Sequence, residues 1–330
     1  MKRAVSMHFS TIFFCWFLLV SSSTFANDSI GSVAVGGIAF LKSEDVRLVR
    51  EYLLISPDAI RIRYRFLNES GKDIYTTVAF PMPPYGWNPG WYMGMANERP
   101  LETFKVNVNG KHIDTRRDMR AMIGNKDVTG LLRNVGLTDE QLFKTFAMCL
   151  DENEGTERFC GVTKAQEDRL KQIGSWKVAE TALWEQSFPS HEEIEVRHEY
   201  VPFVGDSYMY VYQQGKFDYS ELEQTSDACL DPSTTNAIKR KVQSLVNHGA
   251  TVARIRVKRV EYILGTGRNW KGPIKEFSLR LEKDSPNQIL SLCFPGTPKR
   301  INQTALEFKQ NNYVPQDMVT VYFFEVRRDI

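Results

Sequence analysis

Apolar and charged side chains alternate strictly along several stretches of this sequence. Ile60, Ile62, Tyr64 and Phe66 are separated by three arginines. Because successive side chains of a strand point to opposite faces, this pattern predicts a strand with one buried and one solvated face. The same period recurs in residues 104–108, 194–200, 277–281 and 319–323, and residues 46–55, 74–80 and 255–264 are expected to be further strands. The sequence therefore predicts a mainly β (α+β) fold with an antiparallel, β-sandwich-like architecture.

Turn and helix signals interrupt this alternation. Asn109 and Gly110 form a dipeptide preferred in tight hairpins, so a short strand should follow them. From about residue 120 to residue 174 the apolar spacing becomes helical. Threonines at 138 and 163 each precede a glutamine by three residues, which is the spacing of a capping box. Residues 142–150 share one helical stripe, and residues 237–246 predict a further helix.

These signals divide the chain into regions. We expect residues 27–118 to form an N-terminal antiparallel β region and residues 119–174 a helical insertion. Residues 175–330 should form a C-terminal β-rich region with one helix. We expect residues 27–330 to make one continuous domain, since their length suits one large domain or two ordinary ones.

The first 26 residues have the pattern of an export signal. Lys2 and Arg3 precede an apolar run over residues 12–20, and Thr24 and Ala26 are small residues before a cleavage point. The remaining 304 residues carry 40 basic and 40 acidic side chains and four cysteines. We therefore expect a periplasmic or secreted protein, cleaved near Ala26, that has no general attraction for nucleic acid. No second apolar stretch is long enough for a spanning helix, so we do not expect an integral membrane protein.

The four cysteines after the leader are predicted to form disulfides. Four cysteines allow three pairings, and their distribution favours Cys149 with Cys160 and Cys229 with Cys293. No C-x-x-C motif is present, which argues against a redox-active pair.

Residues 81–100 (PMPPYGWNPGWYMGMANERP) combine prolines and glycines with large apolar side chains. Such rings on a loop are suited to stacking on a glycan or docking on a partner protein, or they fold back and bury in the core. The predicted contact residues are Tyr85, Trp87, Trp91, Tyr92, Met93 and Met95.

We expect no metal and no cofactor. The methionines of this segment could bind Cu(I), but no cysteine or paired histidine reinforces them. The acidic residues 151–157 (DENEGTE) resemble a calcium loop, but Gly155 stands where a ligand is required. A solvated acidic turn explains them better.

His198 is the one weak catalytic candidate. It shares the strand phase of Val196 and Tyr200, so its side chain should point inward. A hydrogen-bonded structural histidine is favoured over a base, because the neighbouring glutamates point to the other face. Two basic ladders, at residues 61–65 and 254–258, would make a cationic stripe only if their strands were neighbours.

Several ordered segments resemble one known family. They are residues 36–40 (GGIAF), 54–56 (LIS), 78–83 (VAFPMP), 184–189 (WEQSFP), 198–205 (HEYVPFVG), 262–274 (YILGTGRNWKGPI) and 291–294 (SLCF). Together they resemble the exported bacterial family called domain of unknown function 4424, over nearly all of residues 27–325. The resemblance implies an exported bacterial domain, and it brings no catalytic residues to this chain.

We therefore expect a non-catalytic binding or scaffold module of the bacterial cell envelope. Its partner would be an envelope protein or glycan bound through the aromatic segment that begins at Tyr85. The alternative is an envelope hydrolase in which His198 works with carboxylates from other strands.

Overall fold

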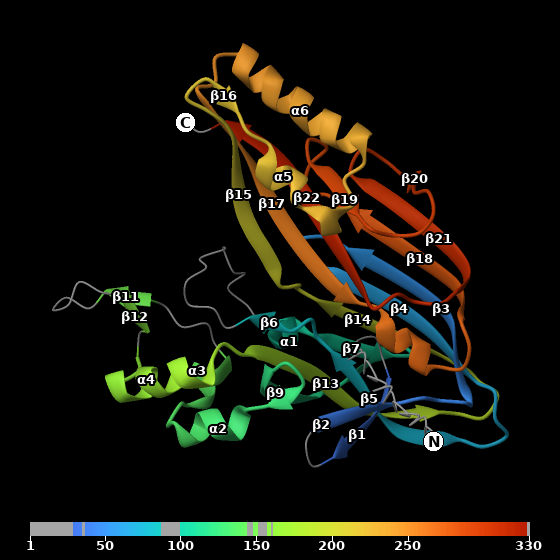
Figure 1. The fold of residues 1–330 in the computed structure, drawn as a ribbon. Coiled ribbons are helices and arrows are strands. Elements are labelled where there is room, and N and C mark those ends of the chain that lie inside the picture. The colour runs from blue at the N-terminus through green and yellow to red at the C-terminus, as the bar shows by residue number, and fades with distance from the viewer. Residues whose placement is uncertain are drawn as a thin grey trace, which may run out of the picture.

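The computed structural model describes residues 29–34, 37–86, 100–143, 148–150, 157–159 and 161–328, and the structural statements below concern these residues. Figure 1 shows three sheets that meet near the middle of the molecule, with helices at the outer ends of two of them. The mainly β, antiparallel architecture predicted from the alternation is confirmed. No helix among these residues is long and apolar enough to cross a bilayer.

The eight-stranded sheet has the order β20-β21-β18-β3-β4-β14-β7-β8. Its strands are β3 (Val46–Ile55), β4 (Ile60–Asn68), β7 (Lys105–Val108), β8 (Lys111–Ile113), β14 (Glu193–Tyr200), β18 (Ile274–Glu282), β20 (Lys299–Arg300) and β21 (Ala305–Tyr313). All neighbours are antiparallel except β18 and β3, which run parallel. Asn109 and Gly110 have φ of 49° and 83°, so the predicted tight turn joins β7 to β8.

The seven-stranded sheet has the order β10-β9-β13-β5-β1-β2, and β6 also pairs with β13. Its strands are β1 (Ser29–Ala34), β2 (Gly37–Leu41), β5 (Ile74–Pro81), β6 (Tyr85–Gly86), β9 (Arg116–Ile123), β10 (Lys126–Asp127) and β13 (Lys177–Phe188). Strand β9 crosses the expected start of the helical insertion at residue 119. The division into three regions otherwise stays a prediction.

The five-stranded sheet has the order β16-β15-β17-β22-β19. Its strands are β15 (Val204–Gln213), β16 (Lys216–Phe217), β17 (Val252–Ile263), β19 (Ile289–Leu292) and β22 (Met318–Arg328). One face of this sheet packs against α6 (Pro232–Asn247). The helix begins before the predicted residue 237 because Asp231 caps it and Pro232 occupies its first position.

Three helices fall in the segment where helices were expected. They are α2 (Thr129–Asn134), α3 (Asp139–Phe143) and α4 (Lys164–Ile173). Both predicted capping boxes form, since each glutamine accepts from the threonine backbone N–H and its own backbone N–H donates to the threonine hydroxyl. The remaining helical elements are α1 (Pro100–Thr103), α5 (Ser220–Glu223) and the 3₁₀ turns η1 (Ser226–Ala228) and η2 (Gly265–Asn269).

The predicted helical stripe over residues 142–150 was wrong for residues 148–150. Helix α3 ends at Phe143, and β11 (Met148–Leu150) pairs with β12 (Glu157–Phe159) as a two-stranded sheet. Cross-strand pairing outweighs a helical spacing that covers only a few residues, because one short turn of helix gains little on its own. Cys149 therefore lies on a strand, not on a helix.

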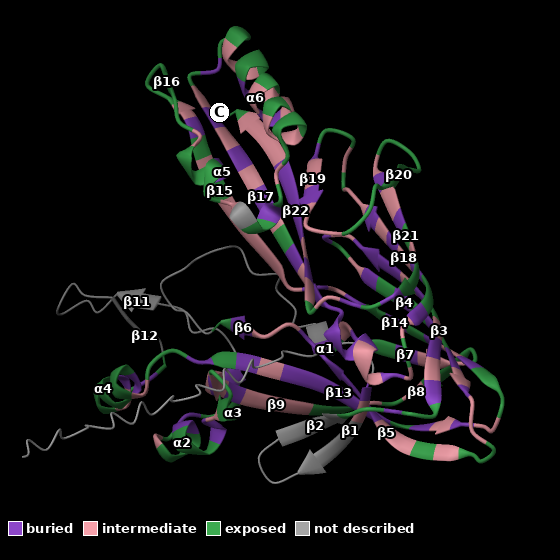
Figure 2. Ribbon diagram, turned by 45° about the vertical axis from the view of Figure 1, so that its right-hand side comes forward, coloured by how far each residue is buried: buried purple, intermediate pink, exposed green. Residues whose placement is uncertain are grey.

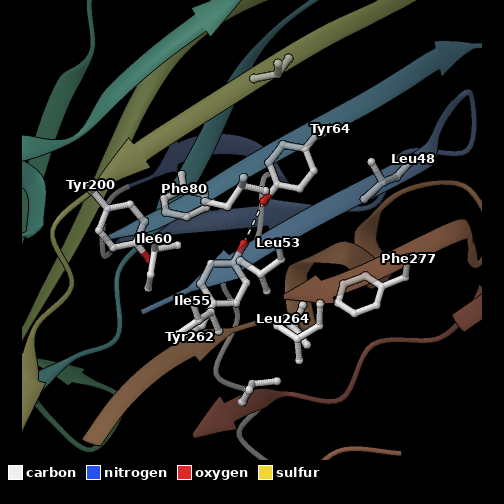
Figure 3. Close-up of a cluster of buried hydrophobic side chains, with 14 of the residues drawn as sticks. Leu48, Leu53, Ile55, Ile60, Tyr64, Phe80, Tyr200, Tyr262, Leu264 and Phe277 are labelled. Carbon is white, nitrogen blue, oxygen red and sulfur yellow. Dashed lines mark hydrogen bonds between the residues drawn. The ribbon is translucent and has the colours of Figure 1, made fainter. Parts of the chain in front are cut away.

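All three sheets contribute to one core. The buried rings of Phe66, Phe80 and Phe323 come from three different sheets and belong to the same apolar cluster. Figure 2 shows buried residues along strands of all three sheets, among them β13, β3 and β22. Inside the cluster the hydroxyls of Tyr64 on β4 and Tyr262 on β17 lie 2.9 Å apart, and Figure 3 shows this bond between the eight- and five-stranded sheets. The smaller clusters lie under α2–α4 and under α6.

His198 lies in this core and points inward, as its strand phase predicted. Only 2% of it is exposed. The rings of Phe80, Phe104, Trp184 and Tyr64 have centroids 4.9–5.4 Å from the imidazole. Burial lowers its pKa from 6.5 to about 3, so the imidazole is neutral in the native protein at neutral pH.

The two basic ladders lie in different sheets, on β4 and β17. Arg61 pairs with Glu199 on the neighbouring strand, and Arg256 pairs with Asp206. The cationic stripe that adjacent ladders would have formed is therefore absent from the described surface.

Cys229 and Cys293 form a disulfide, as predicted. It joins the segment before α6 to the segment after β19, and these cysteines are 64 residues apart. Cys149 and Cys160 lie outside the residues whose side chains are described.

We expect loss of this disulfide to destabilise the protein. A bridge that closes a loop of 64 residues stabilises the native state by about 2–4 kcal/mol, chiefly by restricting the unfolded chain. Urea unfolding of Cys229→Ala/Cys293→Ala should show that loss in the free energy of unfolding. The variant and the reference protein that keeps the Cys229–Cys293 bridge should both also carry Cys149→Ala/Cys160→Ala. Reductant should then destabilise only the reference protein. Equal stability in the absence of reductant would contradict the prediction.

His198 predicts a specific pH dependence of stability. The unfolded imidazole gains a proton below pH 6.5, whereas the buried one does so only near pH 3. The stability it supports is therefore complete above pH 6.5 and falls as the pH drops toward 3, by up to about 1.4 kcal/mol per pH unit. His198→Leu should remove this slope and leave the pH dependence above pH 7 parallel to that of the wild type. Chemical unfolding at a series of pH values measures it, and identical slopes below pH 6 would rule it out.

Candidate functional site

A groove of about 250 Å³ lies where the seven-stranded and five-stranded sheets meet, and we call it the junction groove. In Figure 1 it lies where β6 approaches the lower ends of β15 and β17. Its lining comes from four separate parts of the chain. These residues are Pro83, Pro84, Tyr85, Gly86, Lys177, Tyr200, Pro202, Phe203, Gly205, Arg259 and Glu261.

The first wall is made by an irregular turn between β5 and β6. Pro81 pairs with Thr181 on β13, and Tyr85 pairs with Val178. Three residues on one side therefore oppose two on β13, which is the count of a β-bulge. Pro83 and Pro84 lie in this bulge, where neither is required to donate a ladder hydrogen bond. The bulge carries the backbone away from β13 and toward the groove.

Tyr85 is the first of the six predicted contact residues, and the structure buries it. Its hydroxyl lies 2.9 Å from the carbonyl oxygen of Phe143 and 3.0 Å from a carboxyl oxygen of Glu180. Its ring stacks on Phe203 with centroids 5.5 Å apart and planes at 12°. For Tyr85, the alternative in which the ring folds back into the core therefore holds. It anchors the start of the aromatic segment and joins the two walls of the groove.

Tyr200 lies at the other side of the groove, at the end of β14. Its ring packs against Phe80 and Phe104, with centroids 5.9 Å away in both cases. Its hydroxyl is buried and has no hydrogen-bond partner among the described residues, and burial raises its pKa. This phenol is neutral at any physiological pH, so the groove gains no charge from it.

Charged groups lie at the rim. Arg259 and Glu261 form an ion pair on β17, and Lys177 is exposed at the start of β13. Gly205 pairs with Arg259 across the strands, and a Cβ at position 205 would lie 3.6 Å from the Cβ of Arg259. That is an ordinary contact, so glycine here leaves open space above Arg259 that a larger side chain would occupy.

The walls and the rim of the groove differ in chemistry. Rings and prolines form the walls, and the rim carries both signs of charge. The described lining contains no histidine, cysteine or serine that could act as a nucleophile or as a histidine base. His198, the predicted catalytic candidate, does not line it.

The other predicted contact residues lie outside the described part of the chain. These are Trp87, Trp91, Tyr92, Met93 and Met95, so their role stays a prediction. The possible calcium ligands at 151–156 lie outside it as well. No cluster of three or more metal-binding side chains occurs in the described residues.

Sequence reasoning missed most of the groove, because Lys177, Phe203 and Arg259 lie on segments that converge only in the folded chain. Pro202 beside Phe203 and the Pro83–Pro84 pair were local signals for irregular backbone next to rings.

A second hollow, of about 830 Å³, lies between β9, α2 and α3. Among its lining residues, Arg120 is bound by both Asp118 and Asp127, so these three charges are already paired.

Solved structures show only distant likenesses. A "putative nutrient binding protein" from Legionella pneumophila subsp. pneumophila str. Philadelphia 1 aligns with 14% identity and a TM-score of 0.41, covering 90% of this chain and 72% of that one. Native yeast LTA4 hydrolase aligns with 8% identity and a TM-score of 0.29, covering 85% of this chain and 29% of the hydrolase. Both scores are low, so neither likeness bears on function.

No curated protein matches the sequence. The profile of the family described as "Domain of unknown function (DUF4424)" matches residues 26–322, almost the whole chain and the family expected from the segments quoted above. The chain belongs to this DUF4424 family.

Proposed function

We propose that this protein is an exported, non-catalytic binding or scaffold module of the bacterial cell envelope. It acts in the periplasm or outside the cell, after removal of the leader that ends near Ala26. The observation that carries the proposal is the junction groove, a concave site between two sheets from which the aromatic segment starts.

The groove supports binding because its walls are held in place before a ligand arrives. Tyr85 is tied to Phe143 and Glu180 on one side and stacked on Phe203 on the other. A preformed site loses little conformational entropy when it binds. Sites of this kind commonly lie at junctions between structural units, with apolar walls and few polar groups.

The chemistry of the groove suits an envelope protein or a glycan. Aromatic and proline surfaces pack against sugar faces or apolar side chains, and Lys177 with the Arg259–Glu261 pair offers polar contacts at the rim. Trp87, Trp91, Tyr92, Met93 and Met95 would extend this apolar surface. The neutral charge of the exported part does not favour nucleic acid.

The hydrolase alternative has no observation in its favour. Its base would be His198, which is sealed among four rings and neutral. A general base must reach the proton that it removes, directly or through one water. The buried imidazole does not line the junction groove, so it does not meet this requirement there.

Export predicts a defined N-terminus. The mature protein should begin at Asn27, because Thr24 and Ala26 supply the small residues that signal peptidase requires. N-terminal sequencing and intact mass of the protein from the envelope fraction measure this. Ala26→Arg should block processing and leave the longer precursor. Recovery of the unprocessed wild-type chain in the cytoplasm would contradict export.

Binding through the groove predicts loss of partner capture in specific variants. Chemical cross-linking in intact envelopes should recover a partner with the wild type. Lys177→Glu, which reverses the charge at the rim, and Trp87→Ala/Trp91→Ala should each lower the yield at least about fivefold, a loss of about 1 kcal/mol in binding.

The matched control is Tyr75→Ala, which removes a tyrosine that is 76% exposed on β5 and does not line the groove. Its yield should equal that of the wild type. If the Lys177 variant and the tryptophan variant both capture the partner as well as the wild type does, neither the groove nor the aromatic segment is the binding surface.

A further inference from the structure

The five-stranded sheet ends in a strand whose outer edge is open. Strand β15 pairs with β17 along its whole length, from Val204 to Gln213. On its outer side, β16 pairs only with Tyr212 and Gln213. No backbone hydrogen bond from the described residues reaches the outward N–H and C=O groups of residues 204–210, which span about 23 Å. Figure 1 shows β15 at the margin of its sheet, beyond β17.

This edge lacks the features that usually protect exposed strands. Residues 204–210 contain no proline and no lysine, and the irregularity in the pairing of β15 with β17 lies beyond them, between Tyr210 and Tyr212. Tyr208 and Tyr210 lie two positions apart, so both rings share one face of the strand, and they are 41% and 48% exposed. A bare edge with exposed rings beside it is a surface that accepts another strand.

The edge is nearly free of charge. Asp206 is its one charged side chain, and this carboxylate accepts a hydrogen bond from Nε of Arg256 on β17 at 2.9 Å. The guanidinium carbon of Arg254 lies 4.4 Å from the centroid of Tyr208, and this contact orders the ring before any partner arrives. Two copies of the edge can therefore approach each other without a row of like charges between them.

The sequence of the edge is complementary to itself in the antiparallel direction. When two copies overlap over all of residues 204–210, the two-fold axis passes through Ser207. Val204 then lies opposite the partner's Tyr210, Asp206 lies opposite the partner's Tyr208, and the two copies of Tyr208 are diagonal neighbours. Aromatic rings paired with β-branched or aromatic side chains stabilise neighbouring strands, and like charges directly opposite destabilise them. This register makes the favourable pairs twice and opposes no like charges.

The geometry of the edge also limits the pairing. At one end β16 occupies the same side of β15, and at the other end the strand begins at Val204, after Pro202 and Phe203. Each copy uses its edge once in a two-fold pair, so the interface closes as a dimer and does not continue into a fibre.

We propose that the open edge of β15 between Val204 and Tyr210 binds the same edge of a second copy of this chain, as an antiparallel pair around a two-fold axis at Ser207. Main-chain hydrogen bonds along the edge and packing of Tyr208 and Tyr210 hold the pair together. The two five-stranded sheets then form one sheet across the dimer. The groove is tested through Lys177, which lies on β13 and takes no part in this pairing, so either proposal can fail alone.

The first test is the oligomeric state of the full mature protein. Sedimentation velocity between about 1 and 200 µM should show a dimer whose fraction rises with concentration. Hydrogen exchange at residues 204–210 should slow as the dimer forms, whereas exchange on β4, which is paired on both sides, should not change. Tyr208→Ala/Tyr210→Ala should weaken the dimer at least about tenfold. The matched control is Tyr75→Ala, which removes an exposed tyrosine from another sheet and should dimerise like the wild type.

A charge swap identifies the occupant as a second copy. Tyr208→Lys and Tyr208→Glu each place like charges diagonally across the axis, so each variant alone should dimerise at least about tenfold more weakly than the wild type. An equimolar mixture should recover dimers, because opposite charges then meet across the axis. Circular dichroism and thermal unfolding report whether each variant keeps its fold.

A cysteine at the axis gives a second measurement if a charged variant does not fold. Ser207→Cys places two thiols opposite each other in the dimer, so a short bifunctional maleimide should link two copies. Tyr75→Cys, at an exposed position in another sheet, should not be linked at the same protein concentration.

Three results would overturn the proposal. A protein that stays monomeric at about 200 µM, with unprotected amides at residues 204–210, would show that a second copy does not occupy the edge. A dimer that Tyr208→Ala/Tyr210→Ala leaves intact would place the interface on another surface. Failure of the mixed Lys and Glu variants to dimerise, with both folded, would exclude the two-fold pairing at Ser207.

Discussion

Burial of one apolar core shared by three sheets is the constraint on which the remaining structure depends. Each sheet contributes one face to this core. Within it the hydroxyls of Tyr64 and Tyr262 form a hydrogen bond between the eight- and five-stranded sheets. A buried hydroxyl that lost its partner would cost about 1–3 kcal/mol, so this contact also fixes how those two sheets meet. Strand β6 belongs to the seven-stranded sheet and β15 to the five-stranded one, so the groove between them lies where two sheets that share this core meet.

The same core decides what His198 can do. Four rings surround His198, which the sequence analysis gave as a catalytic candidate. Burial penalises the charged form of the imidazole and lowers its pKa, so the native state keeps it neutral at neutral pH. The site proposed for binding is the junction groove, which His198 does not line.

Local patterns predicted local structure well. The alternation at residues 60–66 and the Asn109–Gly110 turn each depend on neighbours in the sequence, and both appear as expected. The parallel pairing of β18 with β3 joins residues more than two hundred positions apart, and no periodicity reports which strands become neighbours. The groove was missed for the same reason, since Tyr85, Phe203 and Arg259 meet only through that long-range topology. The prediction for residues 148–150 failed for a different reason. A short apolar stripe is compatible with both helix and strand.

The connection from β14 to β15 forms one wall of the junction groove. Phe203 stacks on Tyr85, and two residues later Gly205 lies opposite Arg259 on β17. A Cβ at position 205 would make only ordinary contacts, so the protein's own packing does not demand glycine there. A longer side chain, however, would extend over Arg259 at the rim. Glycine at position 205 therefore keeps the groove open between Phe203 and Arg259, although the packing of the sheet alone does not require it.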